Sequence, residues 1–186
     1  MQALQITDPA FFGRTPSRFS TILARSYRRY HPEWILLRDK QAPNYPALAV
    51  RFLSQARRFK ARLLLHGDYS LAKRLGADGV HLSSRQRAAI RPARQMGLWV
   101  SISCHSEDEA LRALRLGAHR VTLSPVFQTP QKGSPLGLAG FKPTADKIGP
   151  KLVALGGIWT PEQVQLIAAE APVAAFASIR FFLKGI

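Results

Sequence analysis

Hydrophobic residues along this chain fall into short apolar runs separated by stretches with helical spacing. A short run bounded by turn residues predicts a buried strand, and apolar residues three or four apart predict an amphipathic helix. The predicted strands span 3–7, 34–38, 62–66, 79–82, 98–103, 120–124, 151–155 and 173–178. The predicted helices span 17–30, 45–58, 69–75, 106–116, 142–148 and 161–171, with a truncated helix running to Ile186. Segment 84–96 shows no clear pattern, and 126–140 is predicted as a loop.

The order of these elements predicts an α/β protein with a parallel sheet. An internal repeat supports this order, since segment 75–83 recurs as 116–124 with a helix, a glycine and a buried strand in each copy. Closure of the sheet gives a compact (β/α)8 TIM barrel with short helices and a truncated last helix, as a single domain over 1–186. A typical barrel has ~250 residues, so the loops here must be short. An open doubly wound sheet is the alternative, although no Gly-x-Gly-x-x-Gly follows the first strand.

Composition places the chain among soluble globular proteins. Hydrophobic residues make up 46% and charged residues 20% of its 186 residues, both ordinary values. No apolar run approaches the ~18 residues of a membrane span, and the N-terminus lacks a basic-then-apolar signal pattern. Cys104 is the single cysteine, which fits a reducing compartment. We therefore expect a cytoplasmic protein that does not contact membranes.

The charge is strongly positive, with 27 Lys and Arg against 11 Asp and Glu, a formal +16. Such an excess can indicate a nucleic-acid partner. The basic residues are spread over short helical patterns along the chain, and no segment interleaves them with aromatic residues as nucleic-acid modules do. This distribution favours solvated helix faces, and the whole-surface charge is the only support for nucleic-acid binding.

Two apolar runs near the C-terminus end abruptly in small residues, at Gly156-Gly157 and at Ala177-Ser178. Small residues let backbone N–H groups approach a phosphate closely, and a following helix N-terminus adds positive charge. Barrels commonly build a phosphate cup after strands seven and eight in this way. The alternative is that the glycine pair only makes a tight turn.

The other predicted strand ends are rich in basic, hydroxyl and imidazole side chains and poor in carboxylates. Functional residues of a barrel lie at these ends and in the loops that follow them. This composition suits phosphate or diphosphate better than glycoside hydrolysis, which needs paired carboxylates. The candidates are Arg38, Lys40, His66, Ser103, His105, Thr129 and Lys132.

A set of motifs that occur in order resembles the thiamine phosphate synthase superfamily, which also contains the thiazole tautomerases. The set comprises Ile6-Thr7-Asp8, Leu37-Arg38-Asp39-Lys40, Gly76-Ala77-Asp78-Gly79-Val80-His81-Leu82, Ser103-Cys104-His105-Ser106, Pro125-Val126-Phe127-Gln128-Thr129-Pro130, Leu136-Gly137-Leu138 and Ala154-Leu155-Gly156-Gly157-Ile158. The resemblance implies a small barrel and a transferase of thiamine biosynthesis or salvage. In that family an aminopyrimidine diphosphate loses diphosphate to Mg²⁺, and the nitrogen of a thiazole phosphate captures the pyrimidine cation.

The resemblance also implies roles for individual residues. Arg38, Lys40 and Ser103 match diphosphate-contacting positions, and Thr129 and Lys132 match part of a loop that closes over the diphosphate. The backbone of the glycine pair and of Ala177-Ser178 matches the groups that hold the thiazole phosphate.

Several positions depart from the family pattern. Leu36 replaces a Gln, and Gln131 replaces the second Thr of the diphosphate loop. His66-Gly67 stands where the family has Asn and a Mg²⁺-binding Asp, and 83–86 replaces the stretch with the second metal carboxylate. Mg²⁺ would then be held mainly through the substrate diphosphate. Pro125 occupies the position of the tautomerase histidine. The alternative function is a non-catalytic or altered-activity barrel that binds a phosphorylated thiazole-like ligand.

Three histidines and the cysteine need separate interpretation. His66 and His105 end predicted strands, where an imidazole could move a proton near pH 7. A hydrogen bond to a neighbouring loop is the favoured alternative for His105. His81 lies in a buried-strand pattern and is predicted as a core hydrogen-bonding residue, and Cys104 is predicted to face the core. No His and Cys spacing resembles a zinc site.

Overall fold

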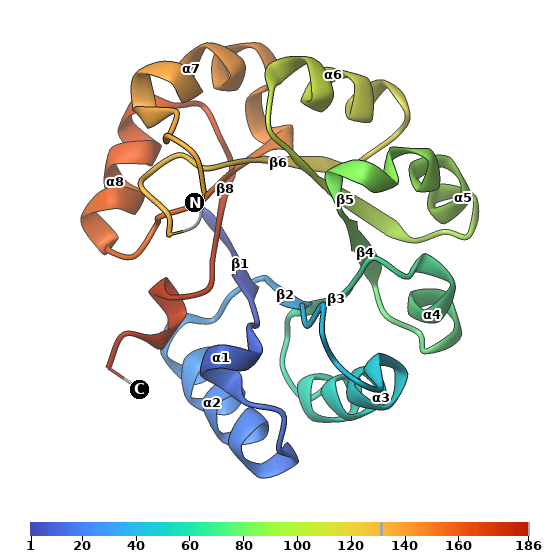
Figure 1. Ribbon diagram of the computed structural model, residues 1–186. Helices are drawn as coiled ribbons and strands as arrows, with labels where there is room; N and C mark the ends of the chain where they lie inside the picture. The colour runs from blue at the N-terminus through green and yellow to red at the C-terminus, as the bar shows by residue number, and fades with distance from the viewer. Residues whose placement is uncertain (131, 186) are drawn as a thin grey trace.

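The computed structural model describes residues 1–130 and 132–185, so Gln131 and Ile186 lie outside the described residues. Its strands are all parallel and close into a barrel in sequence order, with β8 paired to β1 (Figure 1). The strands are β1 Gln2–Ile6, β2 Trp34–Leu37, β3 Arg62–His66, β4 Gly79–Leu82, β5 Trp99–Cys104, β6 Arg120–Leu123, β7 Leu152–Leu155 and β8 Ala175–Ser178. The predicted (β/α)8 barrel is confirmed, and the open doubly wound sheet is excluded.

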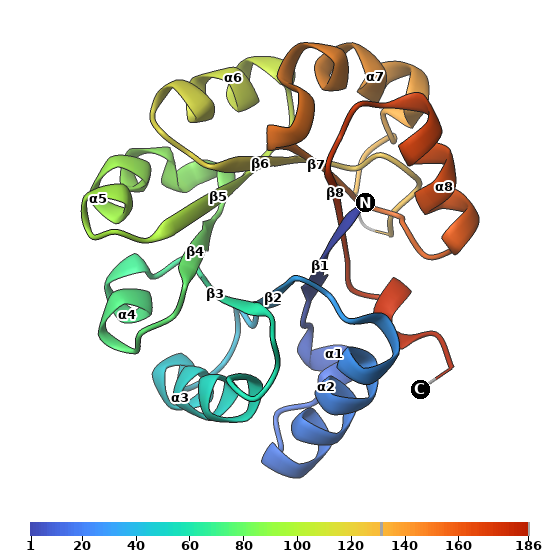
Figure 2. The ribbon, with the colours of Figure 1, turned by 180° about the vertical axis from the view of Figure 1, so that it is seen from behind.

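The helices form a ring around the outside of the barrel (Figure 2). The α-helices are α1 Pro9–Phe12, α2 Pro16–Tyr30, α3 Tyr45–Ala56, α4 Tyr69–Arg74, α5 Ile90–Gln95, α6 Glu107–Arg115, α7 Gly137–Ile148 and α8 Pro161–Glu170. The described part of the chain also contains three 3-10 turns, η1 Ser84–Ala89, η2 Gly149–Lys151 and η3 Phe181–Leu183. In the described residues no helix has both the length and the apolar character that a membrane crossing needs.

The observed elements differ from the predicted ones at four places along the chain. The short helix α1 was not predicted; Asp8 caps it by accepting the Ala10 N–H at 3.0 Å. The unpatterned segment 84–96 forms η1 and α5. Helix α7 begins at Gly137 inside the predicted loop, because the Leu136 and Gly137 N–H groups bond back to Pro125 and Val126. The truncated last helix is a 3-10 turn within the described residues, η3, which lies beside α2.

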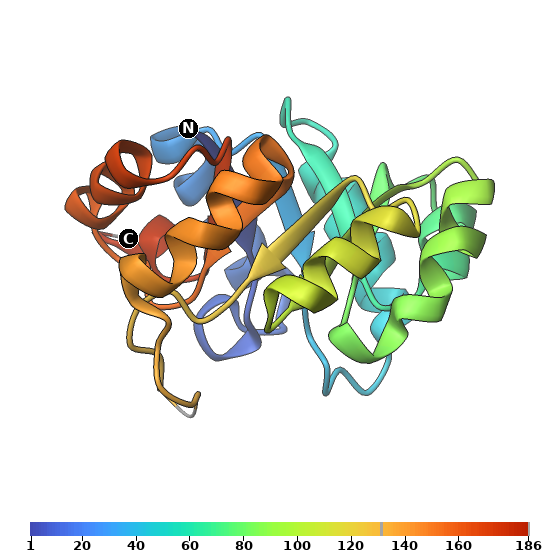
Figure 3. The same cartoon turned by 90° about the horizontal axis from the view of Figure 1, so that it is seen from above.

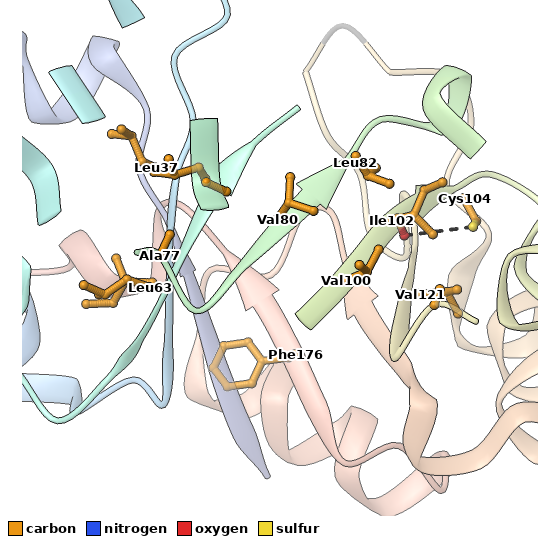
Figure 4. Close-up of a cluster of buried hydrophobic side chains, with 14 of the residues drawn as sticks. Leu37, Leu63, Ala77, Val80, Leu82, Val100, Ile102, Cys104, Val121 and Phe176 are labelled. Carbon is orange, nitrogen blue, oxygen red and sulfur yellow. Dashed lines mark hydrogen bonds between the residues drawn. The ribbon is translucent and has the colours of Figure 1, made fainter. Parts of the chain in front are cut away.

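Two hydrophobic clusters hold the barrel together. The larger lies between the sheet and the helices, and Figure 4 shows part of it, including Val80, Ile102 and Cys104. Burial raises the pKa of the Cys104 thiol to about 12, so this residue is an inert part of the core and the prediction for it is confirmed. The smaller cluster fills the barrel interior. There the rings of Trp34 and Trp99, at the starts of β2 and β5, stack with centroids 4.0 Å apart.

Loops after the strands project from one side of the barrel, and the longest of them follows β6 (Figure 3). This loop carries Thr129 and Lys132. The ends of parallel strands meet on the same side, so side chains from distant parts of the chain come together there.

Candidate active site

A cavity of about 530 Å³ opens at the carboxyl ends of the strands, a volume typical of small-molecule sites. Every candidate residue named from the sequence lines this cavity. They are Arg38, Lys40, His66, Ser103, His105, Thr129, Lys132, Gly156, Gly157, Ala177 and Ser178. The structure therefore places the small-residue strand ends and the basic side chains in one site.

The ends of β7 and β8 form a cup of backbone N–H groups. Gly156 and Gly157 have φ of 98° and 68°, and a Cβ on Gly157 would lie 2.5 Å from the carbonyl oxygen of Gln128. Only glycine lets the loop after β6 pack this closely against the end of β7. Among the described residues, no acceptor is found for the N–H groups of Gly157, Ile179 and Arg180, which all line the cavity. Free N–H groups at strand ends are what an oxyanion requires.

The Ser178 hydroxyl is already engaged within the protein. It donates to the Ile158 carbonyl at 2.6 Å and accepts the Phe181 N–H at 3.2 Å. Ser178 therefore fixes the path of the chain after β8. Backbone N–H groups are the part of this strand end that can meet a ligand.

Cationic side chains gather on the β2 side of the cavity. The Arg38 guanidinium pairs with the Asp8 carboxylate at 3.2 Å. The backbone N–H of Arg38 donates to the Thr7 hydroxyl at 3.0 Å. Burial, followed by the charges of Arg38, Lys132 and Arg85, lowers the pKa of Lys40. A bound polyanion would relieve this repulsion among cations.

A bidentate ion pair fixes the loop that carries Lys40. The Arg14 Nε donates to Asp39 Oδ2 at 2.6 Å, and a second guanidinium nitrogen donates to Oδ1 at 2.9 Å. The Arg14 hydrogen bond is the main reason why the pKa of the buried Asp39 carboxyl is lowered. Asp39 does not line the cavity, so its negative charge supports the loop without opposing an anion. No motif or spacing indicated that Arg14 would take this part.

His81 orients Ser103 from the core. The His81 Nε2 lies 2.9 Å from the Ser103 hydroxyl, and its Nδ1 lies 2.7 Å from the Ser101 hydroxyl. Burial lowers the pKa of His81 to about 3, so the imidazole is neutral. Its predicted part as a core hydrogen-bonding residue is confirmed, and its ring also forms part of the cavity wall.

His66 and His105 differ in their surroundings. Burial, and then the charges of Lys40 and Arg38, lower the pKa of His66 to about 4. A neutral His66 can exchange hydrogen bonds with a ligand at pH 7 but is a weak base there. The His105 Nδ1 lies 3.3 Å from the Ser124 carbonyl, which is the loop hydrogen bond given as its alternative.

The residues present do not fit a Mg²⁺ ion held by the protein. The side-chain amide of Gln86 donates to the Gly67 carbonyl at 2.8 Å, which ties together the two segments where the resemblance to the family implied metal carboxylates. Asp68 caps α4 by accepting the Leu71 N–H at 2.8 Å. Asp8 is the only carboxylate among the described lining residues, and it is paired with Arg38. In the described residues no group of three His, Cys, Asp or Glu side chains is placed to hold a metal.

Several lining residues were not predicted from the sequence, and three of them have large side chains. Phe11, Trp159 and Arg180 come from α1 and from the loops after β7 and β8. Arg180 lies two residues after Ser178 of the predicted cup, and this closeness is the only sequence signal that points to it.

Fold and site together define a (β/α)8 barrel with a basic cavity at the carboxyl ends of its strands. The chain belongs to the thiamine monophosphate synthase family, whose model matches residues 5–180. A putative thiamine-phosphate synthase of Geobacter sulfurreducens is 35% identical over 153 residues, covering 77% of this chain and 71% of the relative. The thiamine-phosphate synthase of Thermus thermophilus is 37% identical over 144 residues, covering 75% of this chain and 70% of the relative.

A solved structure supports the fold independently. The thiamine phosphate pyrophosphorylase from Pyrococcus furiosus superposes with a TM-score of 0.77 at 22% identity, covering 96% of this chain and 85% of that chain. At this identity the likeness concerns the barrel fold alone.

The lowered pKa of His66 predicts a pH dependence of stability. Its value of about 4 in the folded protein lies below the ordinary 6.5, so the unfolded chain binds more protons between these values. The contribution of neutral His66 to the free energy of unfolding is complete above pH 6.5 and is lost as the pH falls toward 4. The free energy of unfolding should fall by at most about 1.4 kcal/mol per pH unit in this range. Urea unfolding of the His66→Asn variant from pH 7 to 4.5 should show a shallower loss than the wild type. Equal slopes would contradict the assignment.

Proposed function

We propose that this protein joins an aminopyrimidine diphosphate to a thiazole phosphate and releases diphosphate, in thiamine biosynthesis or salvage. The single observation that carries the proposal is one cavity with two separate electropositive regions, the free N–H groups at the ends of β7 and β8 and the cations near β2 and β6. Family membership supports the same reaction. We place the reaction in the cytoplasm, where a lone thiol such as Cys104 stays reduced.

Arg38, Lys40, Lys132 and Ser103 are the groups that would bind the diphosphate. When the C–O bond to the pyrimidine methylene breaks, its electron pair and the developing negative charge pass to the diphosphate. Cations placed beforehand stabilise this charge without reorganising. The thiazole nitrogen then forms the new C–N bond to the methylene carbon, and diphosphate leaves.

The β7–β8 end of the cavity would hold the acceptor. Gly156, Gly157, Ala177 and Ser178 would receive the thiazole phosphate, so that its ring nitrogen reaches toward the pyrimidine. Thr129 hydrogen-bonds the Phe127 carbonyl at 3.0 Å and would support the loop over the diphosphate. His105 would line the acceptor side.

The pyrimidine would lie over Leu36 and His66, which both line the cavity. Leu36 is a fully buried apolar side chain and offers no hydrogen-bonding group. The neutral imidazole of His66 is then the polar group that would hydrogen-bond the pyrimidine. Any Mg²⁺ would arrive on the diphosphate oxygens, because the described residues offer it no cluster of carboxylates.

Incubation of the purified protein with both substrates and Mg²⁺ tests this function. We expect thiamine phosphate to form only when both substrates are present, and the Lys40→Ala variant to serve as the inactive control. Absence of product above background, together with thiazole phosphate binding in calorimetry, would overturn the synthase function.

A non-catalytic or altered-activity barrel is the second candidate. The hydrogen bond between Gln86 and Gly67, at the place of the metal carboxylates, favours it. Such a protein would bind a phosphorylated thiazole-like ligand at the cup and give no coupling product. The coupling assay with both substrates separates the two functions.

Restoring carboxylates at these positions should create a metal site. A Cβ on Gly67 would lie 3.5 Å from Gln86 Oε1, so Gly67→Asp with Gln86→Asp brings two carboxylates together. The positive φ of Gly67 makes the first change cost about 1–2 kcal/mol. Mg²⁺ should then raise the melting temperature of the double variant and leave that of the wild type unchanged. The Asn pair, Gly67→Asn with Gln86→Asn, carries similar backbone strain without charge and should not respond. An equal response of both pairs would refute the metal site.

A further inference from the structure

The guanidinium of Arg180 lies over two aromatic rings at the rim of the cavity. Its Cζ is 4.6 Å from the ring centre of Trp159 and 5.5 Å from that of Phe11. The three residues belong to segments that follow β8, β7 and β1, which are neighbours in the barrel. Cation–π contacts on two rings restrict a side chain that would otherwise be mobile. The structure thus holds one arginine in place beside the cup.

No protein carboxylate occupies this guanidinium. Within the described residues Arg180 forms no ion pair, and the one carboxylate lining the cavity, Asp8, is bound to Arg38 and to the Ala10 N–H. Stacking uses the faces of a guanidinium and leaves its N–H edge free. A free N–H fork fits two oxygens of a phosphate.

The cup itself lacks charge. The N–H groups of Gly157, Ile179 and Arg180 are free among the described residues, while the Ser178 hydroxyl is used within the protein. Backbone N–H groups carry only partial positive charge, so a phosphate dianion there requires a cation. The Lys40 and Lys132 side chains come from the loops after β2 and β6. Arg180 is the cation that the cup's own strand provides.

We propose that Arg180 binds the phosphate of a monophosphate ester at the β7–β8 cup, with Trp159 and Phe11 as positioning residues. The identity of the ester, a thiazole phosphate, rests on the function proposed above. The guanidinium of Arg180 donates hydrogen bonds to two phosphate oxygens. The backbone N–H groups of Gly157 and Ile179 donate to the remaining phosphate oxygen. Trp159, although 41% exposed, supports the guanidinium by this stacking.

Calorimetric titration with inorganic phosphate tests this assignment without requiring turnover. The Lys40→Ala background weakens the competing anion region, so that the cup dominates the signal. In it, Arg180→Ala should weaken phosphate binding at least about tenfold, since hydrogen bonds to charged groups are the strong ones. Arg51→Ala removes an exposed arginine from α3 and should change the affinity less than twofold. Arg180→Lys keeps the charge, loses the fork and should bind with intermediate affinity.

A double-mutant cycle tests the positioning role. Trp159→Leu alone should weaken phosphate binding severalfold, and adding it to Arg180→Ala should weaken it no further, because Trp159 acts through Arg180. Additive losses, or an Arg180→Ala affinity within twofold of its background, would overturn the inference. Phosphate binding that needs Arg180 in a protein that makes no thiamine phosphate would keep this inference and remove the synthase function. Coupling activity in a protein whose phosphate affinity does not depend on Arg180 would keep the synthase function and overturn this inference.

Discussion

Replacing Lys40 with alanine is expected to lower kcat/KM for coupling by about 100- to 1,000-fold, the loss typical of removing one preorganised group from a developing anion. Lys40 lines the cavity, and the bidentate pair of Arg14 with Asp39 fixes its loop. The described residues provide no cluster of carboxylates for a metal. Side-chain cations must therefore supply much of the charge that stabilises the leaving diphosphate.

Steady-state kinetics with both substrates varied measures this loss. Lys60→Ala is the matched control, because it removes an exposed lysine that does not line the cavity. Lys40→Arg keeps the charge and should recover part of the rate. A Lys40→Ala enzyme with an unchanged kcat/KM would show that the diphosphate binds elsewhere.

The same cations predict how diphosphate affinity changes with pH. Burial and the charges of Arg38, Lys132 and Arg85 lower the pKa of Lys40. Lys40 therefore loses its proton, and the cavity one positive charge, at a lower pH than an ordinary lysine would. The affinity for diphosphate, measured by calorimetry across a pH series, should start to fall correspondingly early as the pH rises.

The strands were predictable because each is a short apolar run buried in the barrel. Strand β4 was predicted at 79–82, where the structure has it, since all four of its residues are buried. Helix α1 has only four residues and no periodic signal, and its position depends on the cap by Asp8. The start of α7 depends on the hydrogen bonds from Leu136 and Gly137 to residues just after β6, and this closure of the loop leaves no periodic pattern.

The site was predictable where it follows from strand ends. The rule that barrels act at the carboxyl ends of strands placed Arg38, Ser103 and Gly157 in one cavity. That rule does not predict which side chains of different loops contact one another. The stack of Arg180 on Trp159 and Phe11 joins residues far apart in the sequence, and no spacing encodes it.

The glycine pair at the end of β7 is the feature whose alteration should have the largest effect on stability, and it should also impair activity. A Cβ on Gly157 would lie 2.5 Å from the Gln128 carbonyl oxygen and 2.6 Å from the Phe127 carbonyl carbon, and its φ of 68° disfavours any side chain. The clash is with backbone, so the loop carrying Thr129 and Lys132 must move. We expect Gly157→Ala to lower the free energy of unfolding by about 3 kcal/mol or more, combining backbone strain with overpacking.

Gly97→Ala separates the two causes of this loss. Gly97 has a φ of 78°, but a Cβ added there would meet no atom within 4 Å, so its replacement costs only the backbone strain, about 1–2 kcal/mol. Urea unfolding of both variants measures the difference. Kinetics should divide them further, because Gly97 does not line the cavity and its variant should keep wild-type kcat/KM, whereas Gly157→Ala should lose most of it. Equal losses of stability with full activity in both variants would mean that the Gly156-Gly157 pair serves only as a tight turn. The close contact between the β6 loop and the end of β7 would then matter neither to folding nor to the cup.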